Sequence, residues 1–306
     1  MNKNIKGAIL TMSGGICWGL SGSMGQYLFT NEGMDSKWLV PIRLGIAGLC
    51  MLVWCLFKEG KKLFAVFKNK KDLSLLAAYG LLGVSLSQFT YFLTIQLSSA
   101  GVGTIMQDLS PVMILMCSCV ISKRKPHIYE LAALFFALAG VFLIVTHGNI
   151  NEFAVSPGAL IAGIICAGCV TVYNMLTKTL TKKYSVESLQ AWSFLAGGIV
   201  FFFILQSWKI NYTPSFMGFV GIAFVVIVGN IMAFTFYIKG VSYIGPSSGI
   251  LYGFAEPVTA ALITALLMGS PFGIWDLLGF ICIFVMLVLI SVNNRKDSKQ
   301  KLNSTK

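Results

Sequence analysis

Residues 110–120 read SPVMILMCSCV and residues 256–266 read EPVTAALITAL, and the two stretches align without a gap at an offset of 146. The same offset relates three further pairs around them: Gly83 with Gly229, Tyr91 with Tyr237, and Glu130 with Asp276. A chain whose halves match in this way contains a tandem repeat. The repeat unit therefore decides the fold.

The composition excludes a water-soluble protein. Of the 306 residues, 56% are hydrophobic and 11% are charged, and the mean hydropathy is +0.79, whereas soluble domains carry about 25% charged residues. The high apolar content excludes disorder, and the 31 glycines follow no three-residue collagen period. We therefore predict a polytopic membrane protein.

Ten apolar stretches are long enough to cross about 30 Å of hydrocarbon as helices. Helices are expected because lipid cannot satisfy exposed backbone groups, and the period-two pattern of a barrel does not occur in the sequence. The predicted fold class is all-α, with ten transmembrane helices at approximately 6–28, 39–57, 73–95, 99–121, 129–147, 157–177, 187–207, 215–238, 245–268 and 273–292.

Each repeat holds five spans, and an odd number inverts the second copy relative to the membrane. Inverted repeats of this kind are typical of secondary transporters. We predict a first five-helix repeat over 1–150, a second over 151–292, and a basic cytoplasmic tail over 293–306.

The net charge of +12 indicates orientation. Twenty of the 23 Lys and Arg residues lie at the termini or in even-numbered loops, whereas Lys37 and Lys209 lie in odd-numbered loops and Arg43 lies within a span. The positive-inside rule then places both termini in the cytoplasm of a multi-pass plasma (inner) membrane protein. The basic residues favour contact with anionic lipid, and we expect no nucleic-acid partner.

Four stretches resemble the EamA-type repeats of the drug/metabolite transporter superfamily: GAILTMSGGICWGLSGS (7–23), PIRLGIAGL (41–49), YFLTIQLSSAGVGTIMQDLSPVMILM (91–116) and FYIKGVSYIGPSSGILYGFAEPVTAALITALL (236–267). THGN at 146–149 and the Arg43 region are most similar to the branch of carboxylate, amino acid and amine transporters. The resemblance covers nearly the whole chain. It implies two five-helix bundles around a central substrate cavity, often in exporters, and it implies no particular substrate. We expect no cofactor and no metal.

Two carboxylates are predicted near the bilayer midplane: Asp108, about ten residues into the fourth span, and Glu256, about eleven into the ninth. An ionised carboxylate there costs on the order of 3 kcal/mol, so each must face a cavity or a partner, or be protonated. We predict that Asp108 acts in transport, because the repeat places Phe254 at its counterpart. For Glu256, a role in transport and a structural hydrogen bond to a neighbouring helix both stay open.

Arg43 lies only about four to five residues inside the outer edge of the second span. A long basic side chain at that depth is expected to extend to the interface or to join a structural ion pair. If it faced the cavity instead, it would attract carboxylate substrates.

Polar and aromatic side chains share faces of the first, third, sixth and eighth spans. They could form a box that holds an ammonium group or an aromatic ring, although ordinary helix packing uses the same residue types. With the two carboxylates, the predicted substrate-binding set is Trp18, Gln88, Tyr91, Asp108, Tyr173, Asn174, Asn230, Tyr237 and Glu256.

These features predict a secondary transporter and exporter of a small organic metabolite, such as an amino acid, an amine or a related solute. Alternating access would occur around a midplane cavity. The expected partners are the solute and the lipid bilayer, with protons as a candidate coupling ion and a homodimer left open. A membrane-embedded enzyme and a passive channel or facilitator are the alternatives. They are disfavoured because the sequence has neither a hydrolase motif at depth nor rings of charge.

Overall fold

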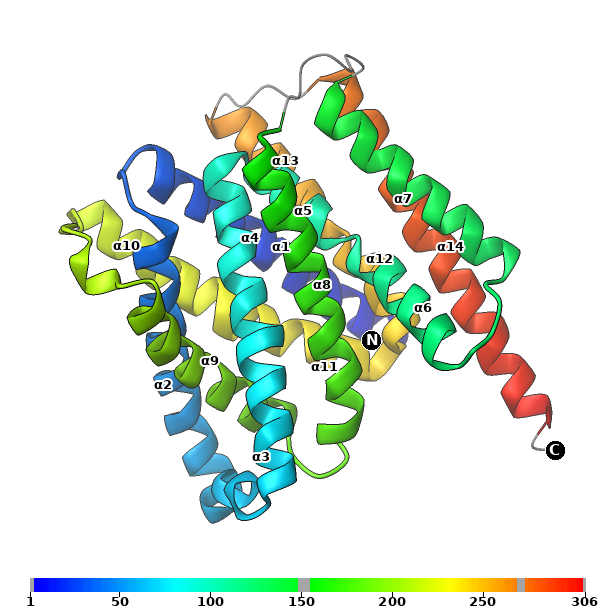
Figure 1. The fold of residues 1–306 in the computed structure, drawn as a ribbon, viewed down its shortest axis with the longest axis horizontal. Coiled ribbons are helices and arrows are strands. Elements are labelled where there is room, and N and C mark those ends of the chain that lie inside the picture. The colour runs from blue at the N-terminus through cyan, green and yellow to red at the C-terminus, as the bar shows by residue number, and fades with distance from the viewer. Residues whose placement is uncertain (1–2, 148–154, 269–272, 305–306) are drawn as a thin grey trace.

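The computed structural model describes residues 3–147, 155–268 and 273–304, and every regular element in those ranges is helical. Ten helical rods follow one another in alternating directions (Figure 1), and each overlaps one predicted span. Eight of the described helices are long and apolar enough to cross a membrane, and Leu251–Leu267 is a shorter apolar helix. The predicted all-α membrane fold is confirmed.

Five rods form each half. Those of the first half are α1 (Lys3–Thr30), α2 (Ser36–Glu59) with its 3-10 extension η1 (Gly60–Lys68), α3–η2–α4 (Lys70–Ala77, Ala78–Ser85, Leu86–Leu97), α5–α6 (Ala100–Gln107, Ser110–Ile121) and α7 (Ile128–Thr146). Those of the second half are α8 (Pro157–Leu180), α9 (Val186–Ile204), α10–η4–α11 (Phe216–Phe224, Val225–Met232, Ala233–Ile244), α12–α13 (Pro246–Gly253, Ala255–Met268) and α14 (Ile274–Ser304); a short 3-10 turn, η3 (Ser207–Lys209), follows α9.

Some predicted positions lie outside the described residues. They are the repeat boundary at 150/151, Gly148 and Asn149 of the THGN stretch, and the last two residues of the chain. α14 continues from the tenth span through most of the predicted tail, as far as Ser304.

Helix irregularities recur at equivalent places in the two halves. The fourth span breaks at Asp108 between α5 and α6, and the ninth breaks at Phe254 between α12 and α13, again at the offset of 146. The third and eighth spans each contain a π-helical segment, η2 and η4. Glu130 and Asp276 also match, since each accepts a backbone N–H from the residue three positions earlier at the start of its helix. The repeat therefore extends to the local distortions of the helices.

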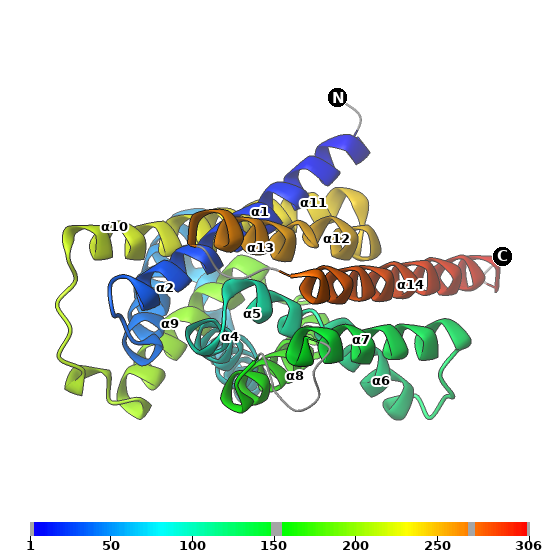
Figure 2. The same cartoon turned by 90° about the horizontal axis from the view of Figure 1, so that it is seen from above.

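The two halves interlock. α1 packs against η4, α11, α12 and α13 of the second half, and α8 packs against η2, α4, α5 and α6 of the first. Figure 2 shows α1 lying across α11 and α13, with α7 and α14 side by side. Each repeat therefore buries the first helix of the other against its broken spans, and the space between the broken spans lies within the protein.

α2 and α9 cross at a pair of glycines. A Cβ on Gly48 would meet the backbone of Leu195, and a Cβ on Gly198 would meet the backbone of Gly45. These two contacts are related by a single offset of 150, so they are the same contact seen from each half. Backbones approach this closely only where side chains are missing.

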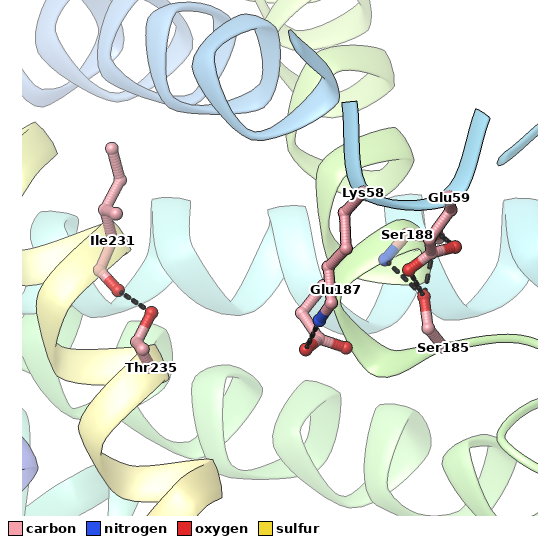
Figure 3. A network of polar contacts seen from close by, with 7 residues as sticks. All are labelled: Lys58, Glu59, Ser185, Glu187, Ser188, Ile231 and Thr235. Atoms are coloured by element: carbon pink, nitrogen blue, oxygen red, sulfur yellow. Dashed lines mark hydrogen bonds and ion pairs between the residues drawn. The ribbon is translucent and has the colours of Figure 1, made fainter. Parts of the chain in front are cut away.

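Polar side chains join the ends of the same two helices. Glu59, at the end of α2, accepts hydrogen bonds from Ser185 Oγ at 2.7 Å and from Ser188 Oγ at 2.6 Å, at the start of α9 (Figure 3). The neighbouring Lys58–Glu187 pair, at 3.0 Å, is exposed, and such pairs contribute little. The glycine crossing and the Glu59 contacts therefore fix α2 against α9.

We predict that Gly48→Ala destabilises the protein by about 1–3 kcal/mol, because the added methyl overpacks the crossing against backbone that cannot move aside. Gly45→Ala, on the same helix, is the matched control, since a Cβ there meets none of the described residues within 4 Å. Thermal unfolding of the purified protein in detergent measures the difference. Equal unfolding temperatures for the two variants would contradict the close crossing.

Candidate functional site

A cavity of about 630 Å³ lies between the two halves. Its wall includes all nine residues of the predicted substrate-binding set, which come from α1, α4, α5–α6, α8, η4–α11 and α13. The spans that supply them are the first, third, fourth, sixth, eighth and ninth, as the sequence predicts. The structure thus brings the nine residues together around one space.

The cavity extends to one end of the bundle. Ser118, Arg124 and Glu130 belong to its wall and lie around the loop between α6 and α7. Because consecutive rods run in opposite directions, this loop lies at the same end of the bundle as η1 and the α8–α9 loop (Figure 1). We call this the basic end, since it carries the lysine-rich second, fourth and sixth loops.

At the other end, α1 is hydrogen-bonded to two helices. Gln26 Oε1 accepts the backbone N–H of Ala100 at 2.7 Å, and Ser23 Oγ donates to the carbonyl of Ala260 at 3.5 Å. These bonds tie α1 to the start of α5 and to α13. The cavity therefore reaches the basic end, and hydrogen bonds of α1 hold the helices together at the other end.

Asp108 occupies the break of the fourth span. Pro111 has no N–H to donate to the carbonyl of Gln107, and Pro257 likewise leaves the carbonyl of Gly253 without its helical donor. Gln107 and Gly253 both line the cavity. Asp108 follows Gln107 in the chain, and its buried Oδ2 has no hydrogen-bond partner among the described residues. A buried acceptor of this kind is costly unless a ligand or water satisfies it.

Glu256 is linked to the opposite half. Tyr91 OH donates to Glu256 Oε1 at 3.5 Å, which joins the third span to the ninth. Of the two roles that the sequence left open for Glu256, the structural hydrogen bond to a neighbouring helix is present. The carboxylate also lines the cavity, and its role in transport stays a prediction.

Several aromatic rings that line the cavity contact one another. The ring of Trp18 lies 5.1 Å from Phe234 and 4.9 Å from Tyr237, centroid to centroid. The rings of Tyr79 and Tyr173 meet edge to face at 6.2 Å. Ring faces in this arrangement can hold an ammonium group by cation–π attraction.

The prediction for Arg43 was wrong. Its side chain is 1% exposed, so it does not extend to the interface, and none of the ion pairs among the described residues includes it. Instead Arg43 lines the cavity, donates to Gln88 Oε1 and lies 3.8 Å above the ring of Phe92. Depth along a span does not reveal which way a helix faces, and here α2 turns Arg43 inward.

Sequence reasoning missed several residues of the wall. Gln190 is 2% exposed, accepts a hydrogen bond from Tyr79 OH at 3.3 Å and leaves its Nε2 unpartnered. In the part of the chain that the structure describes, four residues that line the cavity have buried side-chain atoms without a hydrogen-bond partner: Arg43, Asp108, Gln190 and Asn230. Gln190 lies in an apolar stretch near the start of the seventh span. A polar residue at that position was the available signal.

At the basic end, the cavity wall includes an ion pair of a buried carboxylate with a partly exposed arginine. Arg124 donates to both oxygens of Glu130, at 2.7 and 2.8 Å, and the Glu130 side chain is 1% exposed. Glu130 also accepts the backbone N–H of His127 at the start of α7. This bidentate pair holds the α6–α7 loop against the start of α7.

The comparisons with known proteins agree with this architecture. The EamA-like transporter family matches residues 5–146 and again residues 157–292. The chain is 32% identical to the uncharacterized inner membrane transporter YicL of Salmonella typhimurium, over 98% of this chain and 99% of that protein. It is 24% identical to the uncharacterized transporter YrdR of Bacillus subtilis, over 98% and 96%. Its fold is similar to that of a protein of known crystal structure, with a TM-score of 0.65 and 15% sequence identity. The match covers 95% of this chain and 98% of that protein.

We predict that Arg124→Ala destabilises the protein by about 3 kcal/mol, because it leaves the buried Glu130 carboxylate without its cation. Lys58→Ala breaks an exposed pair and should cost less than about 1 kcal/mol. Thermal unfolding in detergent compares the two variants. An Arg124 variant as stable as the Lys58 variant would show that Glu130 does not depend on the pair.

Proposed function

Because the chain belongs to the EamA-like transporter family, we propose that it is a secondary transporter that exports a small organic metabolite carrying an amine, such as an amino acid, an amine or a related solute. Its apolar helices and its inner membrane relatives make it an integral inner membrane protein. The proposed partners are this solute and the bilayer, with protons as the candidate coupling ion.

Asp108 carries the proposal. Its Oδ2 is buried and has no partner within the described ranges, it lies at a helix break, and Trp18 and Tyr237 line the same cavity. A carboxylate satisfies an ammonium group by charge-assisted hydrogen bonds, and the aromatic faces add cation–π attraction. Glu256 supplies a second carboxylate on the opposite half. An amine-bearing solute, or a proton in its absence, is therefore the ligand that this cavity favours.

The position of the cavity supports export by alternating access. The positive-inside rule assigns the basic end to the cytoplasm, so a solute would enter from that side. At the far end, the hydrogen bonds of α1 to α5 and α13 hold the helices together, which argues against a continuous channel. Alternating access also needs a state that is open to the opposite side of the membrane. The inverted repeat can supply it, because the two halves can exchange their conformations about the midplane.

Replacing the carboxylates tests the role of the cavity in transport. We predict that Asp108→Asn lowers counterflow of amine-bearing solutes in proteoliposomes roughly tenfold to a hundredfold. This is the change in affinity expected when a hydrogen bond to a charged group is lost. Glu256→Gln should lower counterflow less, because Gln can still accept from Tyr91. Glu32→Gln, in a carboxylate outside the cavity wall, serves as the control. Wild-type rates in both cavity variants, with unchanged pH dependence, would refute the carboxylate mechanism.

A further inference from the structure

We propose that Arg43 is an anion-binding subsite of the cavity, and that the solute carries a carboxylate as well as an amine. The inference rests on the proposed function for the amine and extends it to a second charged group on the same molecule.

Arg43 lacks a counter-ion in the described residues. Its guanidinium meets the neutral amide of Gln88 and the ring of Phe92, and its Nε has no partner. An arginine cannot lose its charge in a protein. A buried cation with unused donors is costly unless an anion compensates it. The cavity is the space from which that anion can come, since Arg43 belongs to its wall.

The fold does not require a cation at this position. The offset of 150 that relates the two glycine contacts of α2 and α9 pairs Arg43 with Ser193. Ser193 is equally buried, at 1% exposed, but it does not line the cavity and donates to the carbonyl of Leu189 in its own helix. The same place in the architecture is thus filled by a small, locally satisfied residue. The guanidinium is therefore present for a reason other than packing.

The cavity also restricts the kind of anion. Asp108 and Glu256 line it as well, but neither forms an ion pair with Arg43 in the described structure. Two carboxylates would repel a multiply charged anion such as a phosphate. A single carboxylate matches the planar donor fork of arginine, and an ammonium on the same molecule would match Asp108. An amphoteric solute satisfies all of these groups at once.

Matched probes separate the two charges. The purified protein in detergent is titrated with two amino acids, phenylalanine and leucine, and with analogues that lack one charge. Phenethylamine and 3-methylbutylamine lack the carboxylate, 3-phenylpropionate and 4-methylpentanoate lack the amine, and phenylalaninamide has a neutral amide in place of the carboxylate. The shift in melting temperature as a function of ligand concentration gives the affinity. We expect the wild type to bind at least one amino acid roughly tenfold to a hundredfold more tightly than the amine that lacks its carboxylate. In Arg43→Gln this preference should disappear while binding of the amine persists. Ser193→Ala, at the symmetry-related position, should keep the preference.

Two results would overturn the subsite. One is that the wild type prefers neither amino acid over its amine, and the other is that Arg43→Gln keeps the full preference. If Arg43→Gln does not fold, the wild-type protein alone tests the subsite. Phenylalaninamide has a neutral amide in place of the carboxylate, so it should bind as weakly as phenethylamine. If phenylalaninamide binds as tightly as phenylalanine, the subsite is refuted. Asp108→Asn tests the proposed function separately. If it leaves amine binding intact while the carboxylate preference still depends on Arg43, the amine site fails and the anion subsite stands.

Discussion

Hydrocarbon cannot hydrogen-bond, and this constraint governs where the helices can be interrupted. Both broken spans release a backbone carbonyl, at Gln107 and at Gly253, because a proline follows four residues later. Both carbonyls belong to residues that face the cavity between the halves. Irregular backbone at this depth is stable only where protein or a water-filled space surrounds it. The interlocking of α1 and α8 with the opposite halves creates that surrounding, and the site depends on it.

The sequence was sufficient for the architecture because the relevant signals are local. Span lengths follow from runs of apolar residues, and the repeat follows from the ungapped match of 110–120 with 256–266. The polar residues that converge on the cavity could be predicted for the same reason, since a polar group in a membrane span must face the interior of the protein. All nine of them line one space.

The orientation of individual helices could not be predicted, because it is set by packing. α2 is turned by its glycine contacts with α9, and this rotation directs Arg43 inward. Counting residues from the end of a span gives the depth of a side chain but not its direction, so a snorkelling arginine and a buried one look alike. The π-helical segments η2 and η4 were also invisible, because each lies within an apolar run that is compatible with an ordinary helix.

Most of the charged residues that line the cavity have no charged counterpart in the other half of the protein. Residues that match between the halves, such as Glu130 with Asp276, cap helices, and Gly83 with Gly229 lets helices approach. Away from the basic end, the charges that line the cavity do not match between the halves: Asp108 has Phe254 as its counterpart, Glu256 has Ser110, and Arg43 has Ser193. A fold built from two similar halves requires none of these three charges, and each is expensive to bury. Because all three are found in the wall of one cavity, the chemistry of the solute accounts for them better than the stability of the fold does.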